Sequence, residues 1–197
     1  MANTSLNKYN KKRDFSSTKE PKGKKGKNSS LFVIQKHDAT SLHYDFRLSI
    51  EGVLVLWAVP KGLSTKAGEK RLAIRTEDHP MDYANFEGVI PEGEYGGGTV
   101  LVWDTGEYEP IAEDESHEKT MKQALDNGAM KLYLHGEKLK GGYALVNTGT
   151  NNGNEQWLIF KLDDDEADGR RNPVSTQPDS VLTGRSLKDI EDDDNHE

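Results

Sequence analysis

The stretch 42-LHYDFRLSI-50 decides the expected fold, because its side chains alternate between apolar and polar as in a half-buried β-strand. Successive side chains of a strand point to opposite faces. One face is apolar and predicts a core stripe, formed by Leu42, Tyr44, Phe46, Leu48 and Ile50. The other face carries an imidazole, a carboxylate and a guanidinium in a row, from His43, Asp45 and Arg47.

Seven further short runs share this texture, being β-branched or aromatic and bounded by Gly, Pro, Asn or Asp. They lie at 31–36, 53–59, 71–76, 99–103, 130–135, 142–146 and 157–162. Together with the first stretch they predict a mainly β domain over residues 31–162, an antiparallel barrel or sandwich.

One short helix is expected between these runs. Ser116 is a suitable N-cap for residues 117–127, and Gly128 stands where a C′ glycine would end the helix. The apolar stripe of this helix would consist of Met121, Ala124 and Leu125.

Charge is unevenly distributed along the chain, whose formal net charge is −8. Residues 1–30 hold nine Lys and Arg against two acidic residues, and they are poor in apolar side chains. They predict a flexible basic arm that suits a polyanion, or else a solubilising tail, and residues 1–10 alone should be dispensable. Residues 163–197 predict an acidic, mostly loose tail, of which only 180–187 would dock.

The absence of cysteine excludes disulfides, thiolate zinc sites and a cysteine nucleophile. Any metal must therefore be held by histidines and carboxylates. No apolar run reaches the length of a membrane span, and the basic N-terminus lacks the apolar core of a signal peptide. We therefore expect a cytoplasmic protein without membrane contact.

A metal site is predicted on the polar face of the first stretch. His37 lies six residues before His43, and a short turn over residues 38–41 would fold it back beside His43 and Asp45. Two imidazoles and one carboxylate suit Mn²⁺, Fe²⁺, Co²⁺ or Zn²⁺ and leave positions open for water or substrate. Arg47 beside them suits a phosphate, because a guanidinium grips two oxygens at once. The alternative is a polar face with an Asp45–Arg47 ion pair.

Two later segments can reach this face. In 76-TEDHPMDY-83, His79 precedes a proline, so His79 and Tyr83 would approach from an extended or turn segment. The Gly-rich segment 88-GVIPEGEYGGGTV-100 lacks the Gly-Lys-Ser/Thr of a P-loop and predicts a tight hairpin instead.

Four ordered motifs carry a family resemblance: 35-QKHDATSLHYDFRL, 57-WAVPKG, 77-EDHPMDY and 86-FEGVIPEGEYGGGTV. Together they closely resemble the 3′-phosphoesterase module of bacterial DNA ligase D, which also occurs as a free-standing protein. The resemblance runs from about residue 13 to residue 187, and it includes 180-SVLTGRSL. It implies a compact antiparallel β-barrel that needs a divalent metal, typically Mn²⁺, with Co²⁺ or Zn²⁺ as alternatives.

The implied activity is 3′-end processing in repair by non-homologous end joining. The family removes a 3′-terminal ribonucleoside from a DNA or RNA-tipped primer–template and then removes the remaining 3′-phosphate, which leaves a 3′-hydroxyl. The chain shows no adenylation motif of the Lys-x-Asp-Gly kind. The protein would therefore act alone or recruit an end-joining ligase or polymerase in trans.

The resemblance also implies roles for individual residues. The metal ligands would be His37, His43 and Asp45, and the phosphate-binding and catalytic residues would be Arg47, His79 and Tyr83. Further basic residues implicated in activity are Lys61 and Arg71, and supporting residues of the arm are Arg13, Asp14 and Glu20. This chain departs from the family pattern at Val55-Leu56, where Lys-Ser is usual.

Two other functions fit parts of the sequence. His43-x-Asp45 with a remote histidine would satisfy the facial triad of a non-haem Fe(II) oxygenase, although no clamp for an oxoacid co-substrate is evident. A non-catalytic module that binds nucleic acid through its arm is the other alternative. Turnover of a ribonucleotide-ended primer with and without Mn²⁺ separates all three.

Overall fold

The computed structural model describes residues 4–23, 25–27, 29–112 and 120–196. Its elements, in chain order, are α1 (Thr4–Lys11), β1 (Leu31–Asp38), β2 (Leu42–Ile50), β3 (Val53–Val59), β4 (Arg71–Arg75), β5 (His79–Pro80), the 3₁₀ helix η1 (Met81–Asn85), β6 (Gly88–Ile90), β7 (Gly98–Pro110), α2 (Met121–Asp126), β8 (Ala129–Gly136), β9 (Lys140–Asn151), β10 (Asn154–Lys161), α3 (Pro173–Thr176) and α4 (Leu187–Asp194). No helix in these residues is long and apolar enough to cross a membrane.

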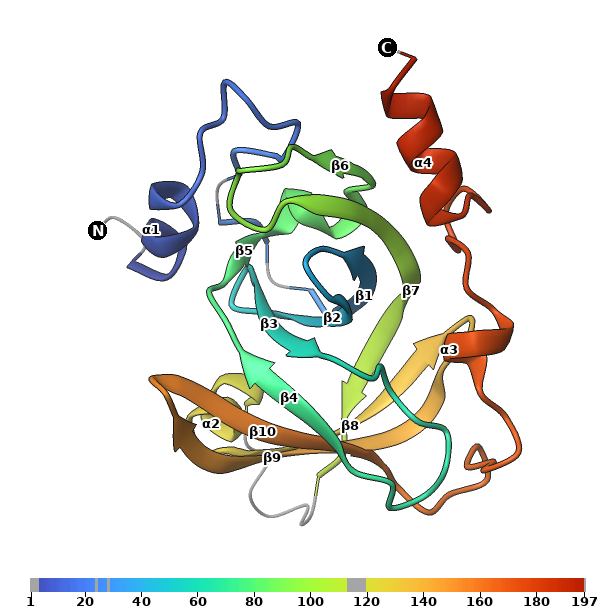
Figure 1. The fold of residues 1–197 in the computed structure, drawn as a ribbon. Helices are drawn as coiled ribbons and strands as arrows, with labels where there is room; N and C mark the ends of the chain where they lie inside the picture. Colours follow the sequence, from blue (N-terminus) through green and yellow to red (C-terminus); the bar gives the residue numbers. More distant parts are fainter. Residues whose placement is uncertain (1–3, 24, 28, 113–119, 197) are drawn as a thin grey trace.

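The strands form one antiparallel sheet that curls into a ring (Figure 1). Its neighbours run in the order β1-β2-β3-β4-β10-β9-β8-β7-β6, and β1 also pairs with β7, which closes the path. The mainly β prediction is therefore confirmed, and each of the eight predicted runs lies in a strand. The hairpin predicted for residues 88–100 is formed by β6 and β7. Among the described residues, the short strand β5, the helices α1, α3 and α4 and the 3₁₀ helix η1 were not predicted.

The ring buries the predicted core stripe of β2, because Tyr44, Phe46, Leu48 and Ile50 all belong to the main hydrophobic cluster. The prediction was wrong at Leu42, which is 44% exposed. Leu42 pairs with Asp38 at the turn end of the β1–β2 hairpin, where the sheet no longer covers it.

The predicted helix, expected over residues 117–127, spans Met121–Asp126 in the residues that the structure describes. Thr120 caps α2 with a reciprocal capping box. Gly128, whose φ is +74°, follows the C-cap residue, as predicted for a glycine that ends the helix. The proposed N-cap Ser116 and residues 117–119 lie outside the described residues. Three partly buried side chains of α2 pack against the core as predicted: Met121, Ala124 and Leu125.

A second, smaller apolar cluster lies on the opposite face of β1, β3 and β7. Val33, Leu54 and Val102 meet Tyr83 of η1 and Tyr9 of α1 there. These strands are therefore buried on both faces, and polar groups on the second face are enclosed as well. On β2, the same face of the sheet carries His43, Asp45 and Arg47.

The N-terminal segment is not the loose arm that its composition predicts. Tyr9 is fully buried and Leu6 nearly so, and the Tyr9 hydroxyl donates to the Pro21 carbonyl at 2.8 Å. Leu6 and Tyr9 lie three residues apart and so share one face of α1. This pair anchors a segment that is otherwise polar, and removing residues 1–10 would expose the surface beneath it.

The C-terminal segment is also held on the ring, where composition predicted a loose tail. Ile190 of α4 is buried, and α4 packs beside β6 and β7 (Figure 1). The predicted docking of 180–187 is confirmed, since the N–H of Val181 donates to the carbonyl of Val102 and Ser180 donates to Glu87. Sparse apolar anchors such as Ile190 are hard to recognise within an acidic sequence.

Candidate active site

The predicted metal ligands come together on the outer face of the β1–β2 hairpin. His37 pairs directly with His43 across the two strands, and their ring centroids lie 4.8 Å apart. Asp45 follows two residues later on the same face. One ligand atom from each of the three residues lies within 4.8 Å of the other two. Strand register alone therefore builds a group that can hold a divalent metal.

The hydrogen bonds of the two imidazoles fix which nitrogen carries the proton. His37 Nε2 lies 2.8 Å from the carbonyl oxygen of Gly96, and His43 Nδ1 lies 2.9 Å from that of Ser41. A carbonyl oxygen only accepts, so both of these nitrogens donate. The other nitrogens, His37 Nδ1 and His43 Nε2, face Asp45 oxygens at 3.7 Å and 3.3 Å.

In the neutral rings, two nitrogen lone pairs therefore converge on a carboxylate. Such an arrangement repels itself unless a cation or a proton sits among the three groups. A metal-binding histidine usually donates its second ring nitrogen to a carbonyl or carboxylate, as His37 and His43 do. The donor set and its hydrogen bonds thus fit a divalent ion such as Mn²⁺, Co²⁺ or Zn²⁺.

Electrostatics supports the same interpretation. Burial lowers the pKa of His43, but the Asp45 carboxylate raises it more, so the net shift is upward. Burial would raise the pKa of Asp45, yet the neighbouring His37 and His43 rings and the charge of Arg47 hold it well below its usual range. Asp45 is therefore an anion, and a proton on His43 competes for the position of the metal.

Arg47 is the most unusual group in the site. Its guanidinium is almost fully buried, donates one hydrogen bond to Asp45 at 3.1 Å, and stacks 4.5 Å from the ring centre of Tyr83. Its Nε and Nη1 atoms are buried without a hydrogen-bond partner. Leu56 is the residue opposite Arg47 on β3, so the departure from Lys-Ser places an apolar side chain beside it.

His79 is held by the N-terminal segment. Its Nδ1 donates to the carbonyl of Glu77 at 3.0 Å, so Nε2 accepts from Nη2 of Arg13 at 3.1 Å. Burial and the charges of Arg47 and Arg13 hold the pKa of His79 well below its usual value. His79 is therefore a neutral imidazole at neutral pH.

Tyr83 and Glu20 complete this side of the site. The Tyr83 hydroxyl donates to Oε1 of Glu20 at 3.1 Å, and the same oxygen accepts from Nε of Arg13 at 2.8 Å. Burial raises the pKa of Tyr83 well above its usual value, so the hydroxyl remains a donor. Tyr9 lies beneath Arg13, with its ring centre 3.8 Å from the guanidinium carbon.

Other predicted residues lie apart from this constellation. Asp14 is close in sequence to Arg13, but its carboxylate is exposed and bonds to Ser16. Lys61 and Arg71 line a separate cavity, and no hydrogen bond or ion pair among the described residues joins them to the metal group.

Sequence reasoning missed three contributors. The buried Glu77 carboxylate pairs with Lys12 at 3.1 Å and with Arg13 at 3.5 Å, and its carbonyl orients His79. The backbone of Gly96 orients His37. Tyr9 supports Arg13. Only Glu77 had a sequence signal, since it lies two residues before His79, whereas backbone carbonyls leave no trace in composition.

The sequence matches the profile of the DNA ligase D 3′-phosphoesterase domain over residues 35–147. It is also 44% identical over 188 residues to the multifunctional non-homologous end joining protein LigD of Pseudomonas aeruginosa, covering 92% of this chain and 22% of that protein. The chain belongs to the DNA ligase D 3′-phosphoesterase domain family.

Two further relatives cover somewhat less of this chain at similar identity. The LigD of Mycolicibacterium smegmatis is 44% identical over 81% of this chain and 21% of its own length. The corresponding DNA repair protein of Mycobacterium tuberculosis is 45% identical over 80% of this chain and 20% of its own length. The chain thus spans about a fifth of the length of these relatives. The residues that match the family profile, 35–147, include the metal group.

Proposed function

We propose that this protein is a divalent-metal-dependent phosphoesterase that processes 3′ ends for DNA repair by end joining. It removes a 3′-terminal ribonucleoside and then the 3′-phosphate, leaving a 3′-hydroxyl. One observation carries the proposal: the lone pairs of His37 and His43 converge on Asp45 directly beside Arg47, whose two free donors face no protein acceptor. A metal group and an unpaired guanidinium together are suited to a phosphate.

The metal that we propose is Mn²⁺, with Co²⁺ or Zn²⁺ as alternatives for the same donor set. When bound at His37, His43 and Asp45, a divalent ion supplies polarisation of a phosphate oxygen and a water of lowered pKa. The protein contributes the rigid placement of its three ligands.

Arg47 binds and orients the phosphate in this proposal. The salt bridge to Asp45 and the stacking on Tyr83 hold the guanidinium in one orientation. Its Nε and Nη1 then donate to phosphate oxygens. These hydrogen bonds also stabilise the negative charge that builds up on the phosphate oxygens as the ester bond breaks. Since these donors are already buried, they need not be desolvated when substrate binds.

Tyr83 and His79 act around the same phosphate. The protonated hydroxyl of Tyr83 turns from Glu20 to a phosphate oxygen. His79 is neutral and accepts from Arg13, so in the substrate-free site it positions Arg13 rather than donating a proton. Lys61 and Arg71 support substrate binding from the neighbouring cavity. Arg13 and Glu20 make the N-terminal segment part of the site, and Asp14 shapes the turn that follows Arg13.

The test uses a 5′-labelled DNA primer with one 3′-terminal ribonucleotide, annealed to a template and incubated with and without Mn²⁺. We expect metal-dependent loss of the terminal nucleoside, followed by loss of the 3′-phosphate. His135→Ala is a matched control for His43→Ala, because His135 is exposed on β8. Absence of metal-dependent turnover would contradict the proposal. We also propose that an end-joining ligase or polymerase outside this chain takes over the 3′-hydroxyl end.

A further inference from the structure

Tyr95 presents an exposed aromatic ring at the rim of the candidate active site. It lies in the Gly-rich loop between β6 and β7 and is 45% exposed, whereas the other Phe, Tyr and Trp rings of the described residues are buried or half-buried. The next residue, Gly96, supplies the carbonyl oxygen that lies 2.8 Å from Nε2 of His37. A ring in this position adds little to the core, and an exposed ring is a surface on which nucleic-acid bases stack.

The ring is held in place by groups that surround His79. Nζ of Lys12 donates to the Tyr95 hydroxyl at 3.0 Å and lies 4.2 Å from the ring centre. The hydroxyl in turn faces the Glu77 carboxylate at 3.5 Å, and the guanidinium carbon of Arg13 lies 5.5 Å from the ring centre. Tyr95 is therefore oriented before substrate binds, although nearly half of the residue remains exposed.

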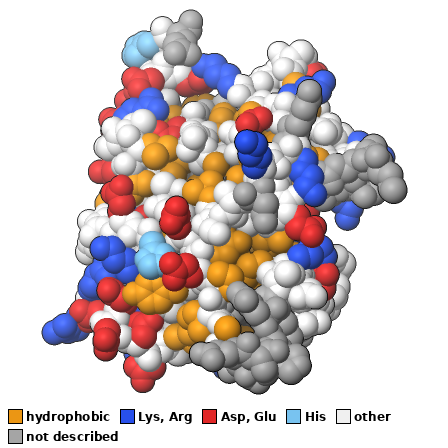
Figure 2. All heavy atoms as spheres, turned by 180° about the vertical axis from the view of Figure 1, so that it is seen from behind, with side chains coloured by type: hydrophobic (Ala, Val, Ile, Leu, Met, Phe, Trp, Pro, Cys, Tyr) orange, Lys and Arg blue, Asp and Glu red, His pale blue; other side chains and the backbone are white. Residues whose placement is uncertain are grey.

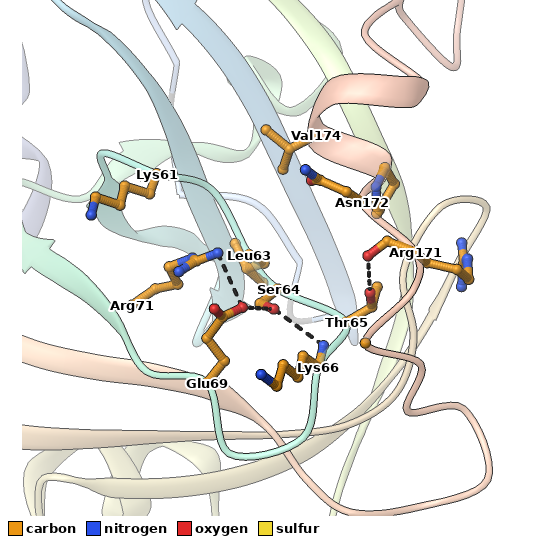
Figure 3. Close-up of a pocket in the computed structure, with 12 residues that line it drawn as sticks. Lys61, Leu63, Ser64, Thr65, Lys66, Glu69, Arg71, Arg171, Asn172 and Val174 are labelled. Atoms are coloured by element: carbon orange, nitrogen blue, oxygen red, sulfur yellow. Dashed lines mark hydrogen bonds and ion pairs between the residues drawn. The ribbon is translucent and has the colours of Figure 1, made fainter.

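The order of the strands places Tyr95 and the cavity of Figure 3 on opposite sides of the metal group. His37 of β1 pairs with Val100 of β7 on one side and with His43 of β2 on the other. The loop that carries Tyr95 leads into β7, whereas β2 is followed across the sheet by β3 and β4. The β3–β4 loop lines the cavity, and none of the described residues around it is aromatic (Figure 3). Of these two sides, only that of Tyr95 offers a ring on which a base can stack.

The proposed reaction gives the two sides of the scissile phosphate different chemistry. In this hydrolysis the bond between phosphorus and the 5′-oxygen of the terminal nucleoside breaks. Water supplies the new oxygen on phosphorus, and the 5′-oxygen leaves as a hydroxyl. The leaving nucleoside carries no further phosphate, whereas every other phosphate of the strand lies on the 5′ side of the reacting group. The site therefore needs cations on one side and a surface for an uncharged nucleoside on the other.

The charges around Tyr95 suit the uncharged side. Residues 88–100, the segment that contains Tyr95, include Glu92 and Glu94 but no Lys or Arg. The rear face of the molecule interleaves acidic and basic side chains and offers no continuous cationic surface (Figure 2). Contacts at the site itself, rather than the charge of the rear face, then orient the strand.

We propose that Tyr95 stacks on the base of the 3′-terminal nucleoside and holds this leaving group while its ester bond breaks. The proposal rests on the proposed function and assigns a binding subsite to the leaving nucleoside. Stacking accepts every base, because each base has a π-face. The two steps of the reaction then differ. Once the nucleoside has left, no base lies beyond the 3′-phosphate, so Tyr95 serves nucleoside removal but not phosphate removal.

The experiment measures the two steps separately on 5′-labelled primer–templates, one ending in a ribonucleotide and the other in a 3′-phosphate. Tyr95→Leu removes the ring, whereas Tyr95→Phe keeps the ring and loses the contacts of the hydroxyl with Lys12 and Glu77. We expect Tyr95→Leu to lower kcat/KM for nucleoside removal about tenfold, within the range for loss of one stacked base, and to lower phosphate removal much less. Tyr95→Phe should resemble the wild type in both steps.

A primer whose terminal ribose carries no base tests the stacking directly. The wild type should remove this sugar about tenfold more slowly than a nucleoside, and Tyr95→Leu should cause no further loss on it. With the base removed from the penultimate nucleotide instead, the effect of Tyr95→Leu should persist. Disappearance of the effect on that primer would place the stacked base on the 5′ side of the phosphate and overturn the assignment.

Three other results would overturn the proposal: an unchanged rate of nucleoside removal in Tyr95→Leu, equal losses in the two steps, or equal losses with and without the terminal base. If Tyr95→Leu were unstable in thermal unfolding, the wild type would still decide, because equal removal of the sugar with and without its base contradicts stacking. Failure of the proposed function would appear differently, as absence of metal-dependent turnover by the wild type on both the ribonucleotide-ended and the 3′-phosphate primer.

Discussion

The β1–β2 hairpin and the N-terminal segment both contribute charged groups to the site, but they hold them by different means. His37, His43 and Asp45 are placed by backbone pairing, so their spacing follows from strand register. Arg13 and Glu20 are placed by side-chain contacts with residues more than sixty positions away. The comparison teaches that metal binding should not depend on the N-terminal segment, whereas substrate processing should depend on both the hairpin and that segment.

The largest effect is expected for His43→Ala. Loss of a metal ligand should lower turnover by about 10³-fold or more, since a bound metal contributes several kcal/mol to such reactions. The core stripe lies on the opposite face of β2, so the melting temperature without metal should be nearly unchanged. Metal titration, turnover and thermal unfolding test this together. Turnover in Mn²⁺ close to that of the wild type would contradict the metal assignment.

Arg47→Lys should have the next largest effect. Lysine keeps the charge but loses the planar fork that presents Nε and Nη1. We expect a rate loss of about 10²-fold, as for removal of one preorganised donor, with Mn²⁺ affinity reduced far less. Single-turnover kinetics at saturating metal measure this. An unchanged rate would reduce Arg47 to a structural partner of Asp45.

Metal affinity should fall as the pH is lowered. Asp45 raises the pKa of His43 above its ordinary value of 6.5, and the protonated ring cannot bind a metal. Below that raised pKa the ion must displace one proton, so affinity should fall by about tenfold per pH unit. Calorimetric titrations with Mn²⁺ between pH 5 and pH 8 would measure the slope. A flat profile would show that His43 does not contribute its Nε2.

The smallest effect on turnover is expected for substitution of Tyr9. This substitution tests whether the N-terminal segment acts separately from the metal group of the β1–β2 hairpin. Tyr9→Ala removes the ring beneath Arg13 and should lower kcat/KM about tenfold or less, because cation–π contacts contribute about 0.5–2 kcal/mol. Tyr9→Phe keeps the ring and should lose little. Mn²⁺ affinity should be the same in both variants. A matching loss of metal affinity would mean that the N-terminal segment also holds the metal group.

This contrast also explains how much could be predicted from the sequence. Alternation along β2 and the six-residue spacing of His37 and His43 are local, so they predicted the strand faces and the metal group. The docking of α1 through Tyr9 and the orientation of His37 by Gly96 arise from contacts between distant segments. Such contacts involve buried rings and backbone carbonyls, which periodicity and composition do not reveal.

The closure of the sheet between β1 and β7 has a consequence for how the site assembles. A hairpin such as β1–β2 forms in about 1–10 μs, whereas pairing of Asp38 with Thr99 must first close a long loop. The two imidazoles therefore meet early, and the Gly96 carbonyl that orients His37 arrives only with β7. Full metal affinity is then a property of the closed seam, and a fall in that affinity would report local opening between β1 and β7 before the remaining structure unfolds.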